Sequence, residues 1–240
     1  MSLEIWDLAG ADDNVRFSPY CWRIHYALAH KGLSATSHPW RFTDKDTIAF
    51  SGQGTVPVLR DGSTVISDSS HIADYLDDIY PDRPLLMDSA QARALCSFIK
   101  QWTQITLSPI VMRTIMPELF AAIADKDKAY FRESREARLG RKLEEFAAPL
   151  DITRAEMKSA LHPLRLTLGS GETPNQLYLS GATPGYADYI VMGHFMWARC
   201  VSQQDLLLEG DPVYAWRERM LDLYDGLGRK APRYTGGAGS

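Results

Sequence analysis

The spacing of apolar and polar positions changes along the chain and divides it into two parts. Up to about residue 80, short apolar runs typical of strands alternate with segments of helical spacing. Further on, apolar positions recur only at steps of three to five residues, as in helices. We therefore expect an α/β domain over residues 1–80, a linker over 81–87, an all-helical domain over 88–230 and a flexible tail over 231–240.

The first part has the predicted order βαβ, a short helix, then ββα. Strands are predicted at residues 3–8 and 35–38, and two apolar runs at 56–59 and 64–66 flank Asp61-Gly62 as in a hairpin. One helix opens at Ser18-Pro19 and stops at Gly32, because serine is a favoured N-cap and proline a favoured first helical residue. A short helix is predicted over 44–50, and another from Ser67-Asp68 to Ile79.

The second part follows a proline-bearing segment, Pro81-Asp82-Arg83-Pro84. Five helices are predicted there, the first with a kink at Pro109, and they cover residues 95–110, 130–146, 153–168, 186–201 and 213–227. The loop 181–185 precedes the fourth, and we expect His194 in that helix to be a core histidine.

Composition and charge exclude several classes of protein. Hydrophobic residues make up 45% of the chain and charged residues 23%, which excludes wholesale disorder. A net charge of −4 gives no basic footprint for nucleic acid or an anionic membrane. Polar residues interrupt every apolar stretch, so no membrane span is expected, and the N-terminus lacks the pattern of a signal peptide. Three cysteines are too few for a disulfide framework, and we expect a cytoplasmic protein.

At the helix start in residues 17–23, Ser18 and Cys21 each have a structural and a functional interpretation. Ser18 alone is most simply a helix cap, but a hydroxyl among the free N–H groups of a helix N-terminus can also donate to a thiolate and lower its pKa. Cys21 is most simply a small buried side chain. Its rival role is a disulfide-exchange nucleophile, which is disfavoured because redox motifs place the attacking thiol first, where Ser18 stands.

Two further pairs lie at a strand start and a helix start. Val56-Pro57 is either an inconsequential edge-strand proline or a cis peptide that turns the backbone of Val56 outward to pair with an extended peptide. Asp68-Ser69 is usually a capping pair, but Ser69 and the helix amides could hold a carboxylate while Asp68 meets an ammonium group. An α-amino acid end carries both groups.

No side chains have convincing metal-ligand or phosphate-loop spacing. His25 follows Cys21 by one turn, but no third group to orient a Cys–His pair is evident. We expect no metal.

The order Ser18, Val56-Pro57, Asp68-Ser69, then a proline-bearing linker and a helical half resembles the cytosolic glutathione S-transferases over nearly the whole chain. Ser18-x-x-x-Trp22-Arg23 is similar to the serine-type first helix of the zeta and related classes. Residues 17–20 and 51–57 are more similar to the bacterial lignin β-aryl-etherase and fungal FuA-like branch. Tyr186-Ala187-Asp188-Tyr189 resembles the family's capping-box segment, although Gly185 replaces its usual Ser or Thr, so we expect a weaker or rearranged cap.

The resemblance implies a thioredoxin-like domain with a four-stranded mixed sheet, an all-α domain, and a homodimer. Ser18 would stabilise the thiolate of glutathione, the cosubstrate, and Val56 would pair with its cysteinyl part beside cis-Pro57. Asp68 and Ser69 would hold the γ-glutamyl end. One more glutathione contact is expected from Arg41, Lys45 or Gln53, among which spacing does not decide. The pocket for a small hydrophobic or aromatic substrate would lie near four residues: Tyr20, Trp102, Met112 and Met116.

These expectations lead to a glutathione transferase of the general alkyl- and aryl-transferring kind, with β-aryl ether cleavage as its most specific form. Two other functions stay open. One is a glutathione-dependent thiol-disulfide or dehalogenating reductase that uses Cys21. The other is a non-catalytic protein that binds hydrophobic ligands in the cleft between the domains.

Overall fold

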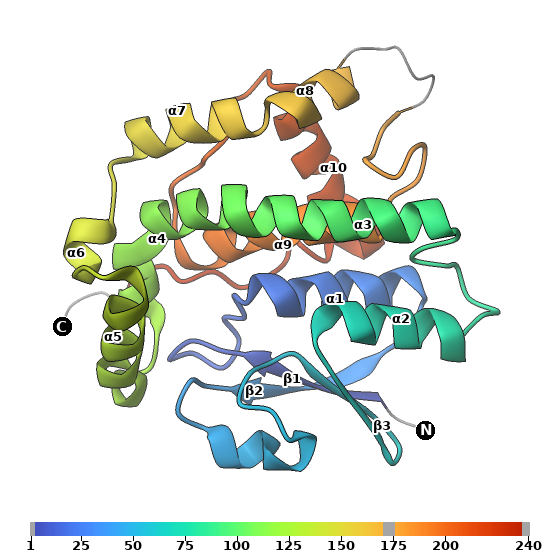
Figure 1. Cartoon of the computed structure of the whole chain (residues 1–240), viewed down its shortest axis with the longest axis horizontal. Coiled ribbons are helices and arrows are strands. Elements are labelled where there is room, and N and C mark those ends of the chain that lie inside the picture. Colours follow the sequence, from blue (N-terminus) through green and yellow to red (C-terminus); the bar gives the residue numbers. More distant parts are fainter. Residues whose placement is uncertain (1–2, 170–175, 237–240) are drawn as a thin grey trace.

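A four-stranded sheet with two helices forms one half of the molecule, and helices alone form the other (Figure 1). The structure is a computed structural model that describes residues 3–169 and 176–236. The first half contains, in chain order, β1 (Leu3–Leu8), α1 (Pro19–His30), β2 (Ala35–Trp40), a 3₁₀ helix (Lys45–Ser51), β3 (Val58–Asp61), β4 (Thr64–Ser67) and α2 (Ser69–Ile79). The predicted order of elements is confirmed.

The sheet is mixed, with the strand order β2-β1-β3-β4. β1 runs parallel to β2 and antiparallel to β3, while β3 and β4 form the predicted hairpin, in which Asp61 pairs with Thr64. β3 begins at Val58 rather than at Val56. Because proline has no N–H for a ladder, the paired strand starts after Pro57. α1 and α2 lie between the sheet and the helical half (Figure 1).

The helical half has more breaks than the apolar spacing predicts. Its elements are α3 (Ala90–Trp102), a π turn (Thr103–Leu107), α4 (Ser108–Ala122), α5 (Asp125–Leu139), α6 (Leu143–Phe146), α7 (Leu150–Ala160), α8 (His162–Gly169), α9 (Tyr186–Val201) and α10 (Pro212–Gly226). The single helices predicted over 130–146 and 153–168 were wrong, because each is two helices. The first break is at Gly140, whose φ of 67° ends α5 in the left-handed region.

The expectation that no stretch is long enough to cross a bilayer was also wrong. α3, the π turn and α4 form one continuous helix, Ala90–Ala122, of 33 residues, in which an 18-residue window has a mean hydropathy of 1.2. Its length and composition alone would let it span a membrane. In the fold, 44% of that window is buried, and α3 and α4 both pack against α9. Core helices of water-soluble proteins can have the same length and mean hydropathy.

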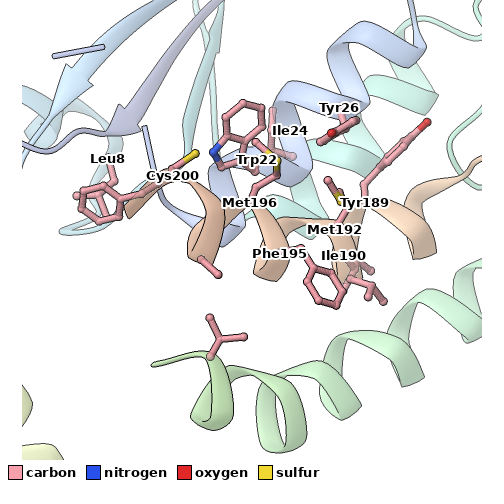
Figure 2. Packing of buried hydrophobic residues seen from close by; sticks show 14 of the residues in the cluster. Leu8, Trp22, Ile24, Tyr26, Tyr189, Ile190, Met192, Phe195, Met196 and Cys200 are labelled. Atoms are coloured by element: carbon pink, nitrogen blue, oxygen red, sulfur yellow. The ribbon is translucent and has the colours of Figure 1, made fainter. Parts of the chain in front are cut away.

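The two halves are joined along the packing of α1 against α9. Figure 2 shows Trp22 and Tyr26 of α1 facing Tyr189 and Met196 of α9, and the rings of Tyr26 and Tyr189 stack with centroids 5.4 Å apart. A Cβ on Gly193 would lie 2.3 Å from the carbonyl oxygen of Pro19. The backbones of α1 and α9 are therefore in direct contact beside the first turn of α1.

The chain after α10 runs back along α9. The backbone N–H of Tyr234 donates to the carbonyl of Cys200 at 2.7 Å, and the Arg233 guanidinium donates to the carbonyls of Arg199 and Ser202. The last four residues of the tail predicted at 231–240 lie outside the described part of the chain.

Candidate active site

A cavity of about 500 Å³ opens where the first half meets α4 and α5. From the first half it is lined by the start of α1, the end of β2 and the segment before β3, including Ser18, Tyr20, Lys45 and Val56. From the helical half it is lined by the π turn, α4, α5 and α9, including Met112. Five of the residues named from the sequence thus lie around one cavity.

Ser18 is the N-cap of α1 and lies in the wall of this cavity. Its backbone is extended, with φ −62° and ψ 124°, and its Oγ accepts a hydrogen bond from the N–H of Cys21 at 3.2 Å. Because Oγ accepts that bond, the hydroxyl proton is left to donate elsewhere. Pro19 at the first helical position fixes this start, as the sequence predicts. The site therefore offers an O–H donor at the positive end of a helix.

Cys21 is fully buried. Burial, followed by the negative charge of Asp7, raises the pKa of its thiol well above the ordinary value. A covered thiol of raised pKa is poorly ionised and out of reach of a disulfide. The geometry therefore favours Ser18 over Cys21 as the residue that acts at this helix start.

Val56 precedes the paired part of β3, and the Val56–Pro57 peptide bond is cis, one of the two alternatives that the sequence left open. The N–H and carbonyl groups of Val56 make no hydrogen bond to another described residue. Val56 also lines the cavity. Its backbone groups are therefore left to pair with an extended ligand.

Asp68 and Ser69 begin α2. Asp68 has φ 70° and ψ 129°, a conformation that costs a non-glycine residue energy and is concentrated at functional sites. Burial opposes its ionisation, but the N–H of Ser70 at 2.7 Å and the charge of Lys100 at 3.6 Å outweigh burial and lower the pKa of Asp68. Ser69 is buried, and its Oγ has no hydrogen-bond partner among the described residues. Neither residue lines the cavity itself.

The three candidates for a further ligand contact are separated by the fold. The guanidinium of Arg41 is held by Asp13 at 2.5 Å and by the carbonyls of Gly10 and Ala11, away from the cavity. Gln53 is exposed and does not line the cavity. Lys45 does line it, with Nζ donating to the carbonyl of Gly54.

The four predicted pocket residues are also divided. Tyr20 and Met112 line the cavity. Met116, on α4, is buried in the hydrophobic core, and Trp102 packs against that core. The phenol of Tyr20 donates to the side-chain oxygen of Gln104 at 2.6 Å. Gln104 lies in the π turn and was missed by the sequence analysis, in which Pro109 indicated only a kink. π turns inside helices are frequent at functional sites.

α5 supplies a wall of the cavity that the sequence analysis missed. The buried carboxylate of Asp127 accepts hydrogen bonds from the N–H groups of Phe42 and Thr43 at 3.2 and 3.0 Å, and this fastens α5 to the segment after β2. The wall brings four further residues to the cavity: Tyr130, Phe131, Arg135 and Arg138. Within the described ranges, no group of three or more His, Cys, Asp or Glu side chains could hold a metal ion.

Comparison with known proteins agrees with this arrangement. The family model for the glutathione S-transferase C-terminal domain matches residues 94–216, and the model for the N-terminal domain matches residues 17–79. Glutathione S-transferase Z2 of Arabidopsis thaliana is 38% identical over 112 residues, which cover 45% of this chain and 48% of that protein. The match thus spans about half of that relative's length.

Two solved fungal structures are similar over almost the whole chain. The glutathione S-transferase CsGST63524 of Ceriporiopsis subvermispora, solved in complex with glutathione, is 24% identical, with a TM-score of 0.83 over 95% of this chain and 98% of that one. GSTFuA2 of Phanerochaete chrysosporium is 26% identical, with a TM-score of 0.75 over 94% of this chain and 93% of that one. With both domains matched in order and the fold shared from end to end, the chain belongs to the glutathione S-transferase family.

Proposed function

We propose that this protein is a glutathione transferase in which Ser18 stabilises the glutathione thiolate. The observation that carries the proposal is the position of Ser18, in the cavity wall at the N-terminus of α1, with its Oγ already accepting the N–H of Cys21. A hydroxyl so placed donates its proton to a bound sulfur, and the helix dipole favours the same negative charge. Both effects lower the pKa of the thiol and raise the concentration of the nucleophile.

The rest of glutathione would extend from Ser18 along the edge of the first half. In this proposal the free backbone groups of Val56, beside cis-Pro57, pair with the cysteinyl part, and Asp68 and Ser69 hold the γ-glutamyl end. Lys45 meets the glycyl carboxylate, because it is the one of the three sequence candidates that lines the cavity. The similar fungal protein that was solved with glutathione supports this choice of cosubstrate.

The second substrate would occupy the apolar part of the cavity, between Tyr20, Met112 and the rings of α5. The thiolate attacks an electrophilic carbon, a C–S bond forms, and the leaving group departs with its electron pair. The aromatic rings of Tyr20 and Tyr130 in the cavity lining suit an aromatic substrate, and β-aryl ether cleavage, in which a phenolate leaves, is the most specific form of the proposal.

We also propose that the chain works as a homodimer in the cytoplasm. Three apolar side chains on one face of the continuous helix are exposed: Leu95 by 39%, Phe98 by 66% and Ile105 by 74%. A face of this kind is suited to burial against a second copy. The free and buried state of Cys21, Cys96 and Cys200 is compatible with a reducing compartment.

Calorimetric titration with glutathione tests the binding site. We expect wild type to bind, and Lys45→Ala to bind about tenfold to a hundredfold more weakly, because a charge-assisted hydrogen bond is lost. Lys126→Ala is the matched control, since Lys126 pairs with Asp44 and lies outside the cavity lining. Its affinity should equal that of wild type. Absence of glutathione binding by wild type would contradict the proposal.

Turnover distinguishes the transferase from a ligand-binding protein. We expect glutathione conjugation of 1-chloro-2,4-dinitrobenzene by wild type, and about the same rate for Cys21→Ser. Tight binding of aromatic compounds without turnover of any electrophile would favour the storage role instead. Loss of activity in Cys21→Ser but not in Ser18→Ala would favour a reductase.

A further inference from the structure

The charges around the cavity all have one sign. Three basic side chains line it, Lys45, Arg135 and Arg138, and the described residues of its lining include no Asp or Glu. The chain as a whole has more acidic than basic residues, 30 against 26. The gathering of cations at this cavity is therefore a local feature, and the cavity attracts anions.

None of these three cations forms an ion pair within the described residues. The Nζ of Lys45 donates to the carbonyl of Gly54 and lies over the ring of Trp40. The Arg135 guanidinium carbon lies 5.2 Å from the ring centroid of Phe42 and 4.8 Å from that of Phe131, with Ser134 Oγ as a hydrogen-bond acceptor. Arg135 therefore keeps most of its N–H donors for another acceptor.

The two arginines are also unfavourable neighbours. Burial, followed by the positive charge of Arg138, lowers the pKa of Arg135. They lie three residues apart on α5, so their side chains share one face of the helix. Elsewhere on α5, Arg132 is paired with Glu136 and Glu144. An anion between Arg135 and Arg138 would remove their repulsion.

We propose that the electrophilic substrate is an aromatic acid, whose ring lies in the apolar part of the cavity beside Tyr20 and Met112 and whose carboxylate is bound by Arg135 and Arg138. The inference rests on the proposed transferase function and deepens it by naming the substrate class. A planar guanidinium binds a carboxylate through two parallel hydrogen bonds, which gives orientation as well as affinity. The acid group would thus fix which carbon of the ring faces the thiolate at Ser18.

Glutathione itself carries carboxylates, so the cations that bind glutathione must be distinguished from those that bind the second substrate. Lys45 lies on the first half, hydrogen-bonded to the segment that leads to Val56. Arg135 and Arg138 project from α5, in the helical half. In this proposal Lys45 serves the glycyl carboxylate, and the arginines are left for the electrophile.

Two matched electrophiles test the proposal, 4-chloro-3-nitrobenzoate and the neutral 4-chloro-3-nitrobenzamide. In both, the thiolate sulfur attacks the carbon that bears chlorine, the C–S bond forms, and chloride leaves with the electron pair of the C–Cl bond. The thiol proton goes to solvent. Dividing each kcat/KM by the rate constant of the uncatalysed reaction removes the difference in intrinsic reactivity between acid and amide.

We expect wild type to prefer the acid by about tenfold or more in this corrected kcat/KM. Arg135→Gln and Arg138→Gln should each lose most of that preference, while their rates with the amide and their affinity for glutathione change little. Arg135→Lys, which keeps the charge but not the planar guanidinium, should show an intermediate preference for the acid. Arg141→Gln, the same change at an exposed residue just beyond α5 and outside the cavity lining, should behave as wild type.

A binding measurement separates this inference from the proposed function. The conjugates S-(4-carboxy-2-nitrophenyl)glutathione and its carboxamide are titrated into wild type and both arginine variants. Tighter binding of the acid conjugate that depends on Arg135 and Arg138, without turnover of either electrophile, would support the anion site and contradict the transferase function. Equal binding and equal turnover of acid and amide would overturn the anion site alone. It would also be overturned if the arginine variants weakened glutathione binding itself, because the cations would then serve the cosubstrate.

Discussion

At the scale of single residues, polar groups are buried without partners where the halves meet. Arg23 is 1% exposed, and none of its three guanidinium nitrogens has a hydrogen-bond partner among the described residues. The Nε2 atom of His194, on α9, is in the same situation, while its Nδ1 lies 3.1 Å from the carbonyl of Ile190. The prediction that His194 is a core histidine is confirmed, since it is 1% exposed.

The burial of His194 makes stability depend on pH. Burial, followed by the positive charge of Arg23, lowers the pKa of His194 to about 3. In the unfolded chain the pKa returns to about 6.5. Between these values the unfolded chain binds more protons, so the stabilisation is complete above about pH 6.5 and is lost as the pH falls toward 3.

We therefore expect wild type to lose about 2 kcal/mol more stability than His194→Gln when the pH falls from 7 to 5. Urea unfolding at both pH values measures the difference. His71→Gln, at an exposed histidine of α2, is the control and should follow wild type. An identical loss in wild type and His194→Gln would show that His194 is not held neutral by the fold.

At the scale of elements, the start of α9 explains why glycine stands at position 185. The buried carboxylate of Asp188 accepts hydrogen bonds from the N–H groups of Gly185, Leu179 and Ser180, and from the indole of Trp216. A glycine has no side chain to complete a capping box, so the expected rearrangement of the cap is confirmed. A Cβ on Gly185 would lie 2.6 Å from Ser180 Oγ. The preceding loop occupies the space of a capping side chain.

Gly185→Ser, although it installs a favoured N-cap residue, should therefore lower the free energy of unfolding by about 1–3 kcal/mol. Adding Ser180→Gly opens the space and should recover part of the loss. Unfolding of the two single variants and the double variant by urea gives the coupling between the sites. Additive effects would contradict the steric explanation, as would stabilisation by Gly185→Ser alone.

Apolar spacing located most elements, but it could not locate their breaks. The spacing continues through Gly140, and a glycine tolerated inside a helix looks the same in sequence as one that ends it. The helix starts at Ser18 and Asp68 were predictable because capping is local. The positions of Gln104, Arg135 and Arg138 in the cavity lining were not predictable, because charged and polar residues on a helix usually face solvent. Long-range contacts, among them the hydrogen bonds of Asp127, hold α5 beside the cavity, and apolar spacing does not reveal them.

At the scale of the whole molecule, the close approach of α1 and α9 connects stability to the candidate active site. The carbonyl oxygen of Pro19 lies 2.3 Å from where a Cβ on Gly193 would be, and Pro19 directly follows Ser18. The carbonyl belongs to the backbone and a Cβ is bonded directly to the backbone, so neither can rotate away. A side chain at 193 must push the start of α1 from α9 and shift Ser18 with it.

Gly193→Ala is expected to cost about 1–3 kcal/mol of stability or more, and to weaken glutathione binding as well. Thermal unfolding and calorimetric titration measure the two effects on the same preparation. A variant with unchanged stability, or with lower stability but wild-type affinity for glutathione, would show that the packing of α1 on α9 is not coupled to the site.

The central claim, that Ser18 stabilises a thiolate, is tested most directly by the pKa of the thiol of bound glutathione. Thiolate absorbance is followed against pH in wild type, in Ser18→Ala and in Ser159→Ala, a control at an exposed serine of α7. We expect a pKa below the ordinary thiol value of about 8.5 in wild type and the control, and a return toward that value, by about one unit or more, in Ser18→Ala. The same lowered pKa in Ser18→Ala as in wild type would contradict the account.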